Sequence, residues 1–227
     1  MQRFFVDHAP KDGKVVITDK EQIRQITKVL RLQTGDRSIV IFDGMEYEVT
    51  WKQLDSKTAL GDVVDSRMGL ALNHEVVLCV ALLKNDKLEW VVQKATELGV
   101  GRIMLMKTKH CVKQEASDSF VTRLRKIAQE AAEQSEGAQV PSIDAPVSFE
   151  QAIARANEYG KAYLLHERGG QSFGGISKGV FMVGPEGGFD ESEFLLATSK
   201  GVTMVSLGKR ILRAETAAIA VLAKVLL

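Results

Sequence analysis

The chain has 227 residues, of which 45% are hydrophobic and 26% charged, a balance typical of globular proteins that excludes a disordered or low-complexity chain. Its net charge of +1 excludes overall basicity as a sign of nucleic-acid binding, so any RNA contact requires a local basic patch. Cys79 and Cys111 are the only cysteines, which excludes a disulfide framework and favours a reducing, cytoplasmic compartment.

The first 72 residues carry short strand patterns separated by turn residues. RFFVD and KVVIT predict strands, and RSIVIFDGMEYEVTWKQL predicts a hairpin that turns at Asp43 and Gly44. The intervening stretch TDKEQIRQITKVLRLQTGD has apolar residues at helical spacing, with Thr18 or Asp19 as the N-cap. Short strands around one helix indicate a small β-barrel, so we predict that residues 1–72 form a separate domain.

From residue 73 onward, strand patterns alternate with helix patterns. EVVLCVALL is the continuous apolar run expected of a strand that is buried on both faces, and KLEWVVQKATELGV predicts an amphipathic helix ending at Gly99. The alternation continues through a Gly/Ser-rich loop, QSFGGISKG, to the apolar tail AIAVLAKVLL, which predicts a final buried helix. This pattern predicts an α/β domain with a mainly parallel sheet over residues 73–227.

Three of the predicted strands end in loops with polar and glycine residues: YLLHERGG, VFMVGPEGGF and VSLGKRILR. Parallel sheets bind ligands outside the carboxyl ends of their strands, so all three loops are expected to open on one edge of the sheet. Neither the P-loop pattern nor GxGxxG is present, which argues against a nucleoside triphosphate or a dinucleotide as the ligand.

The loop GPEGGF contains three glycines, which allow a ligand to approach the backbone closely. Asp190 and Glu193 fit the N-cap and N3 positions of a capping box, and Phe189 and Phe194 fit its hydrophobic staple. Asp190 then occupies the free amides of the helix, which argues against a phosphate bound there. The spacing fits a plain strand-to-helix turn equally well.

In LGKRILRAETA, helical spacing would place Arg210 and Arg213 on one face at the start of the last helix, where their charge opposes the helix dipole. A negative or polar partner is therefore expected at this helix mouth. The alternative is a solvated helix start in which Arg213 pairs with Glu215 or Glu186.

VGPEGGF followed by LGKRILRAETA resembles the signature of the RsmE-type 16S ribosomal RNA uridine-N3 methyltransferases of the SPOUT class. RFFV, VLR, FDG, QKATELGV and AAEQS follow in the family's order, so the resemblance covers nearly the whole chain. It implies a PUA-like β-barrel that binds RNA over residues 1–72. It also implies a SPOUT methyltransferase domain over residues 73–227, tied in a deep trefoil knot that periodicity alone would not indicate.

The resemblance further implies that S-adenosylmethionine, a sulfonium cation without phosphate, binds between the three loops, and that no metal is used. Glycine would let its adenine and ribose lie against the main chain. The cofactor-binding residues implied in this chain are Leu165, His166, Val183, Gly184, Glu186, Gly188, Leu207, Gly208, Ile211 and Leu212.

By the same resemblance, the reaction is methyl transfer to N3 of a uridine in 16S ribosomal RNA of the small subunit. N3 carries a proton that must leave, so a carboxylate and a cation are expected nearby. We expect Arg213 to stabilise the anionic ring and Arg210 to hold a phosphate or the target base. Glu215 would either orient Arg213 or accept the proton.

RNA contact is also expected on the N-terminal domain, where four basic residues are predicted to form a stripe; the alternative is a solvated helix face diluted by neighbouring acidic residues. These residues are Arg3, Arg24, Lys28 and Arg31.

The sequence departs from the family pattern at three positions. Gln25, His110 and Gly137 stand where family members often have histidine, arginine and arginine, respectively. The departures at Gly137 and Gln25 suggest one alternative, an RNA-binding assembly factor that kept the fold and lost the chemistry. A methyltransferase that acts on transfer RNA or another RNA is a second alternative, because related folds do so. Arg213, Glu215 and the intact GPEGG loop favour activity over the first alternative.

The tail helix is apolar nearly all round, with Lys224 as its only charge, and a terminal helix of this kind needs cover on both sides. We therefore predict a homodimer, which the resemblance also implies, with Ile219 and Leu222 at the interface. The alternative is that the N-terminal domain covers the helix. Trp51 and Trp90 are predicted as core or interface residues rather than base-stacking platforms.

Overall fold

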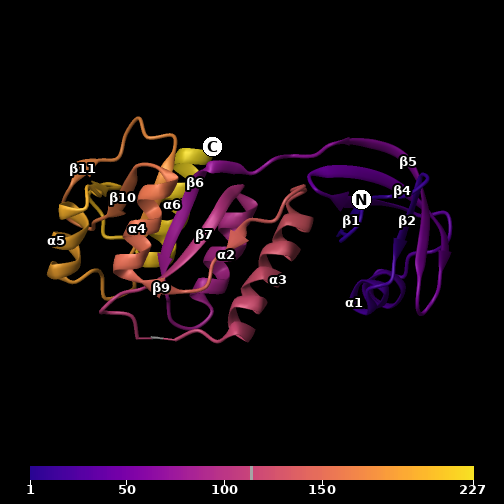
Figure 1. Ribbon diagram of the computed structural model, residues 1–227, viewed down its shortest axis with the longest axis horizontal. Helices are drawn as coiled ribbons and strands as arrows, with labels where there is room; N and C mark the ends of the chain where they lie inside the picture. The colour runs from indigo at the N-terminus through magenta and orange to yellow at the C-terminus, as the bar shows by residue number, and fades with distance from the viewer. Residues whose placement is uncertain (113–114) are drawn as a thin grey trace. The chain divides into compact units, whose positions relative to one another are not determined.

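The computed structural model describes residues 1–112 and 115–227 and divides into two compact units (Figure 1). Unit 1 comprises Met1–Ala71 together with Ala132–Gln139, and unit 2 comprises Leu72–Ala131 together with Val140–Leu227. The sequence pattern assigned residues 132–139 to the C-terminal domain, whereas in the structure they pack with the N-terminal strands.

Unit 1 is built on one mixed sheet of five strands in the order β1-β3-β4-β5-β2, in which β1 and β3 are parallel and the other pairs antiparallel. The predicted hairpin turn is confirmed, because Asp43 and Gly44 join β3 to β4 with φ of 47° and 78°. Trp51 is fully buried in this unit's core, as predicted. The strands are β1 (Gln2–Phe5), β2 (Lys14–Ile17), β3 (Arg37–Phe42), β4 (Met45–Leu54) and β5 (Ala59–Met68).

The predicted helix of unit 1 begins as an α-helix, α1 (Lys20–Arg24), and continues as a π-helical turn, η1 (Gln25–Val29). Asp19, not Thr18, is the N-cap, because its carboxylate accepts a hydrogen bond of 2.9 Å from the Gln22 amide. Within this wider turn Val29 is 66% exposed, whereas the following Leu30 still packs against the core of unit 1.

A buried ion pair lies beside the segment 132–139. Arg3 donates to Glu46 Oε1, at 2.9 Å from Nη1, and to the Glu136 carbonyl at 3.3 Å. Arg67 donates to the other oxygen of Glu46 at 2.9 Å. Ala138 is buried against β3. Both charge and apolar contact therefore join residues 132–139 to unit 1.

Unit 2 is built on an eight-stranded sheet in the order β11-β13-β10-β12-β6-β7-β8, with β9 paired to β7, and every pair is parallel. The predicted parallel α/β architecture is thus confirmed. The Gly/Ser-rich stretch expected to be a loop contains a short strand, β11, which pairs with β13. The strands are β6 (Asn73–Ala81), β7 (Val100–Lys107), β8 (Ser142–Ile143), β9 (Val147–Ser148), β10 (Ala162–Leu165), β11 (Gln171–Ser172), β12 (Gly179–Val183) and β13 (Thr203–Ser206).

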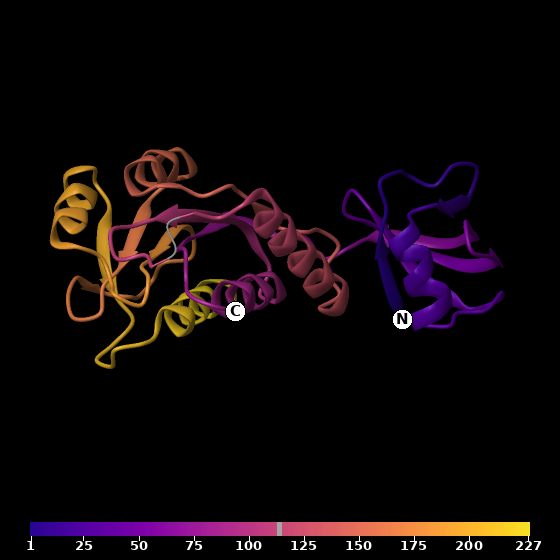
Figure 2. The same cartoon turned by 90° about the horizontal axis from the view of Figure 1, so that it is seen from below.

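Helices cover both faces of this sheet, with α2 and α6 on one face and α4 on the other (Figure 2). This arrangement explains why β6 reads as a continuous apolar run. In the part of the chain that the structure describes, no helix combines the length and apolarity that crossing a bilayer requires. The helices are α2 (Lys87–Glu97), α3 (Asp118–Gln134), α4 (Phe149–Tyr159), α5 (Glu191–Ser199) and α6 (Ala214–Leu226).

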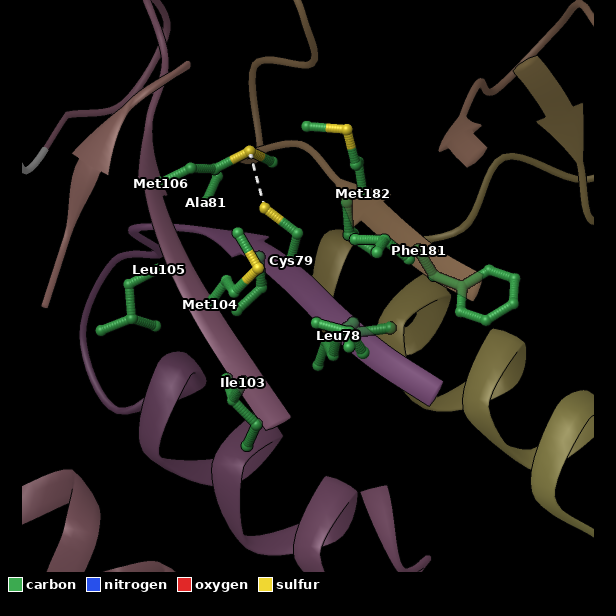
Figure 3. Close-up of a cluster of buried hydrophobic side chains, with 14 of the residues drawn as sticks. Leu78, Cys79, Ala81, Ile103, Met104, Leu105, Met106, Phe181 and Met182 are labelled. Carbon is green, nitrogen blue, oxygen red and sulfur yellow. Dashed lines mark hydrogen bonds between the residues drawn. The ribbon is translucent and has the colours of Figure 1, made fainter. Parts of the chain in front are cut away.

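A cluster of buried side chains in the core of unit 2 lies where β6 is paired with β7 and β12 (Figure 3). Cys79 is buried there with its Sγ 3.5 Å from Met106 Sδ, and burial raises the pKa of its thiol to about 12. Cys79 thus lies within the apolar run EVVLCVALL that predicted a strand buried on both faces.

The last helix, α6, packs against α2, β6 and β12. Leu222 is completely buried by these elements, so its predicted place at an interface between copies is wrong. Ile219 is only partly buried and lies outside the core cluster. The helix therefore has one core side and one incompletely covered side.

Candidate active site

The three loops predicted to share one edge of the sheet do so. The segments that follow β10, β12 and β13, together with the start of α6, enclose a cavity of about 420 Å³. Each of the ten residues predicted to bind a cofactor lines this cavity. The lining residues are Lys87, Leu165, His166, Glu167, Val183, Gly184, Pro185, Glu186, Gly188, Phe189, Phe194, Ser206, Leu207, Gly208, Arg210, Ile211, Leu212, Arg213, Ala214 and Ala217.

The loop after β12 is fixed by the first turn of α5. Asp190 and Glu193 form the predicted capping box, in which the Asp190 amide donates to Glu193 Oε2 at 2.9 Å. Phe189 and Phe194 pack edge to face with their ring centres 5.7 Å apart, as the staple requires. Both features confirm the sequence-based prediction, and Phe189 and Phe194 also line the cavity.

Two glycines leave open space beside the backbone of the cavity. Gly188 and Gly208 have φ of 70° and 141°, and a Cβ at either position would meet no atom within 4 Å. These positions therefore combine a backbone conformation that favours glycine with room for a ligand against the main chain. Gly184 serves packing instead, since its Cβ would lie 2.9 Å from the Phe189 ring.

The loop after β13 differs from the expected helix start. Residues 207–213 are not helical, and α6 begins only at Ala214, with Arg213 as an extended N-cap residue at φ −62° and ψ 153°. The prediction that Arg210 and Arg213 share a helix face in the first turn is wrong, because both precede the helix. They nevertheless line the same cavity.

Lys87, the first residue of α2, joins two carboxylates of the site. Its Nζ donates to Glu186 Oε1 at 3.1 Å and lies 3.5 Å from Glu215 Oε2. The Lys84 amide also donates to Glu186 Oε1, at 3.2 Å. The pairing considered from sequence, between Arg213 and either glutamate, is replaced by pairing through Lys87.

The charges of this network support one another. The hydrogen bond to Glu186 raises the pKa of Lys87. Burial raises the pKa of Glu186, but hydrogen bonds from its own amide, from Lys87 and from the Lys84 amide outweigh it and leave that pKa below its ordinary value. Both groups are therefore charged at neutral pH.

One carboxylate oxygen of Glu215 accepts no hydrogen bond from the described residues. Its side chain is 16% exposed, and its Oε2 is buried without a hydrogen-bond partner among the described residues, because the Lys87 contact at 3.5 Å is an ion pair without hydrogen-bond geometry. Burying a carboxylate oxygen without a hydrogen bond costs free energy, and the ion pair with Lys87 offsets part of that cost.

A second, more open cavity of about 530 Å³ adjoins the first and shares Lys87 and Arg213 with it. Trp90 lines this cavity and is 44% exposed, so it is not the core residue that the sequence allowed. The complete lining is Asn85, Asp86, Lys87, Trp90, Arg213, Glu215 and Thr216.

Two histidines contact the cavity loops. His166 packs against Phe194 with ring centres 4.6 Å apart, and His110 Nδ1 lies 3.0 Å from the Gly187 carbonyl oxygen. His110, one of the three departures from the family pattern, therefore supports the GPEGG loop. Within residues 1–112 and 115–227, His, Cys, Asp and Glu form no cluster of three or more that could hold a metal ion.

The predicted RNA-binding residues of unit 1 divide into two groups. Arg3 is only 6% exposed and is committed to Glu46, so its inclusion in the basic stripe is wrong. Arg24, Lys28 and Arg31 are exposed. Of the four predicted residues, these three have side chains that are accessible to an RNA backbone.

The sequence did not predict Lys87 as a site residue. Lys87 and Glu186 lie 99 positions apart, and no motif connects them. Lys87 comes close to the site because it is the first residue of α2, which packs on α6. The sequence contains no sign of this, because the packing of two helices against each other is not visible in periodicity.

Comparisons with known proteins agree with the architecture. The family model described as an RNA methyltransferase domain matches residues 71–226. A solved structure of a ribosomal RNA small subunit methyltransferase E from Neisseria gonorrhoeae, bound to S-adenosyl methionine, superposes with a TM-score of 0.89 at 27% identity, covering 99% of this chain and 96% of that chain.

Curated relatives match over almost their whole length. The proteins named ribosomal RNA small subunit methyltransferase E from Rickettsia conorii and Bacillus subtilis are each 30% identical to this chain. The alignments cover 95% of this chain and 90% of the Rickettsia protein, and 96% of this chain and 93% of the Bacillus protein. The chain therefore belongs to the RNA methyltransferase family that includes the ribosomal RNA small subunit methyltransferases E.

Proposed function

We propose that this protein uses S-adenosylmethionine to methylate N3 of a uridine in the 16S ribosomal RNA of the small subunit. The observation that carries the proposal is the cavity of about 420 Å³, in which all ten cofactor residues expected from the family lie together. The relatives matched over nearly the whole chain are named as small subunit ribosomal RNA methyltransferases.

S-adenosylmethionine fits this cavity by size and by chemistry. Cavities of a few hundred Å³ hold ligands of its size, and the open space beside Gly188 and Gly208 accepts adenine and ribose against the main chain. Three carboxylates line or adjoin the cavity, those of Glu167, Glu186 and Glu215, which suits a cationic ligand without phosphate. When bound, the cofactor supplies a methyl group activated by its sulfonium.

The charged residues at the start of α6 perform the proton chemistry. Glu215 accepts the N3 proton of the uracil on its carboxylate, so that N3 becomes a nucleophile. Arg213 stabilises the negative charge that spreads over the ring. Arg210, exposed at the rim of the cofactor cavity, holds a phosphate of the RNA.

The proposal also assigns a role to unit 1 and a knotted chain path to unit 2. Unit 1 acts as a PUA-like RNA-binding barrel that uses Arg24, Lys28 and Arg31, and unit 2 is the SPOUT domain with a deep trefoil knot. The path of the chain supports the knot, because β13 pairs with β10 on the side away from β12, yet the following helix α6 packs back against β12 and β6.

The protein acts as a homodimer in the cytoplasm, where ribosomal subunits are assembled. The uncovered side of α6, with Ile219, Ala220 and Ala223 outside the core cluster, supports a self-complementary interface in unit 2. Such an interface would bring a second copy close to the start of α6 and hence to Arg213.

The experiment is to map methylation in small-subunit RNA from cells with and without the gene. Methyl at N3 blocks the Watson–Crick edge, so reverse transcriptase stops at the modified uridine in wild-type RNA and reads through in the deletion strain. Purified protein and S-adenosylmethionine should restore the stop on subunits from the deletion strain. A stop that persists without the gene, methylation of another RNA only, or cofactor binding without methyl transfer would each contradict the proposal.

A further inference from the structure

We propose that the second cavity, beside Trp90, is the site of the acceptor uracil, which stacks on the indole while its N3 edge faces Glu215, Lys87 and Arg213, which line the same cavity. This inference rests on the proposed function and adds the residues that select the base. It is carried by the lining of the cavity, which brings a half-exposed tryptophan, a carboxylate and two cations together.

Trp90 provides the stacking surface. It lies on α2, is 44% exposed and lines the cavity, so part of the indole faces the open space. A base that has left its helix is held in most RNA-binding sites by an aromatic side chain, because every base has a π face to stack. An exposed tryptophan beside two cationic side chains suits a nucleobase whose negative charge rises during the reaction.

The polar groups of the cavity match uracil and not cytosine. The Watson–Crick edge of uracil presents an acceptor, a donor and an acceptor: O2, N3–H and O4. The cavity supplies the complement, since the Glu215 carboxylate is an acceptor and Lys87 and Arg213 are donors. Cytosine has a lone pair at N3, which would face the carboxylate oxygen and leave it without a hydrogen bond.

The two cavities are coupled through Lys87. Glu186, which belongs to the GPEGG loop of the cofactor cavity, holds the Lys87 ammonium at 3.1 Å, and Glu215 of the second cavity lies 3.5 Å from the same nitrogen. A ligand in either cavity therefore meets the same cation. This places the acceptor base next to the cofactor without any further element of the fold.

The lining argues for a base rather than for a second protein copy at this point. Four of the seven residues carry charge, namely Asp86, Lys87, Arg213 and Glu215. Charged residues are depleted at the centres of protein interfaces, whereas recognition of a uracil edge needs them. The experiment below also tests the alternative, in which Trp90 lies in an interface between two copies of the chain.

The first experiment replaces Trp90 in the full-length protein and measures methyl transfer to small ribosomal subunits from a strain lacking the mark. Trp90→Ala should raise KM for the subunits roughly tenfold, because base stacking on an aromatic side chain contributes ~1–3 kcal/mol. Trp90→Phe should retain most of the affinity. S-adenosylmethionine binding, measured by calorimetry, should stay within about twofold of wild type, which also reports that the variant is folded.

Tyr159→Ala is the matched control, since Tyr159 is an aromatic residue of similar exposure on α4 and lines neither cavity. It should leave KM and cofactor binding unchanged. An unchanged KM in Trp90→Ala would overturn the inference, and so would a shift of that variant to monomer in light scattering. If the wild-type protein itself transfers no methyl to uridine N3, the proposed function fails instead.

The second experiment tests the reading of the N3 edge. Glu215→Gln keeps the shape of the side chain but cannot take the proton, so its single-turnover rate should rise nearly tenfold per pH unit as solvent base replaces the carboxylate. The wild-type rate should depend less on pH over the same range. Parallel profiles for the two proteins would overturn the role of Glu215 as the group facing N3–H.

Discussion

At the scale of single residues, Gly208 makes the sharpest prediction about cofactor binding. Its φ of 141° disfavours any side chain, and Gly208 lines the cofactor cavity with open space around the position of a Cβ. Gly208→Val should therefore abolish S-adenosylmethionine binding in calorimetry, because the side chain would both strain the loop and occupy the ligand's place.

Gly201→Val is the control for backbone strain. Gly201 also has positive φ, 81°, with no atom within 4 Å of a Cβ, but it follows α5 and lines neither cavity. It should lower stability while leaving the cofactor affinity intact. Equal loss of binding in both variants would mean that strain, and not the ligand's place, explains the effect.

Arg213 makes a separable prediction about the chemical step. It is exposed, lines both cavities, and has no ion pair or hydrogen bond from its guanidinium within the described residues. Arg213→Ala should lower kcat by roughly 100- to 1000-fold, as loss of a positioned group that stabilises charge does, with cofactor affinity nearly unchanged.

Lys209→Ala serves as the control for Arg213, because Lys209 is an exposed cation in the same loop that lines neither cavity. Rapid-quench single-turnover assays would compare the two variants. Normal turnover in Arg213→Ala would remove it from the catalytic set.

Residues near the chemistry were predictable where a motif fixes their neighbours along the chain. Gly188 and Gly208 follow strands that end at the same edge of the sheet. Their place in the lining of one cavity was therefore expected from the topology alone. Lys87 was not predictable, since its contact with Glu186 depends on how α2 sits beside a distant loop. Arg3 was misassigned because it is buried in an ion pair with Glu46 on β4, which is separated from β1 by β3 in the sheet.

At the scale of elements, the capping box of α5 holds the cofactor loop in place. Lys109 donates to Asp190 at 2.8 Å, and this bond, followed by those from the Ser192 hydroxyl and amide, holds the pKa of Asp190 well below its usual range. A carboxyl with a lowered pKa stabilises the fold above its ordinary pKa of about 3.9, and this contribution is lost as the pH falls further.

Asp190→Asn keeps a good N-cap but loses the charge. It should melt below wild type at pH 7, and the difference should shrink as the pH falls below about 4, where the unfolded chain takes up the proton. Asp190→Ala should melt lower than both at pH 7. Thermal unfolding followed by circular dichroism across this pH range checks the order, and a constant difference between wild type and Asp190→Asn would contradict it.

Elements with strong periodicity or capping were predicted well, and short or irregular ones were not. The helix α2 ends before Gly99, and α5 begins after Asp190, as the sequence indicated. The strands β8, β9 and β11 have two residues each, too few to show alternation. The π turn η1 also has no periodic signature of its own, because it continues the apolar spacing of α1.

At the scale of the whole molecule, substitutions on the two sides of α6 should distinguish an effect on dimerisation from an effect on folding. Ile219→Glu places a charge on the incompletely covered side and should convert the full-length protein from dimer to monomer in light scattering, with melting temperature little changed. Leu222→Ala, on the buried side, should instead lower stability by ~2–5 kcal/mol and leave the mass unchanged. A wild-type monomer at micromolar concentration would contradict the proposed homodimer.

The assignment of residues 132–139 to unit 1 makes that unit a discontinuous domain. The chain passes from one unit to the other three times, at residues 71–72, 131–132 and 139–140. A protease that nicks the first junction would consequently leave two fragments that co-elute under native conditions and separate only in denaturant. Arg3 and Glu46 on one fragment would still lie against Glu136 and Ala138 on the other. Deleting the first 71 residues, by contrast, would remove the strands against which residues 132–139 pack and would expose Ala138 to water.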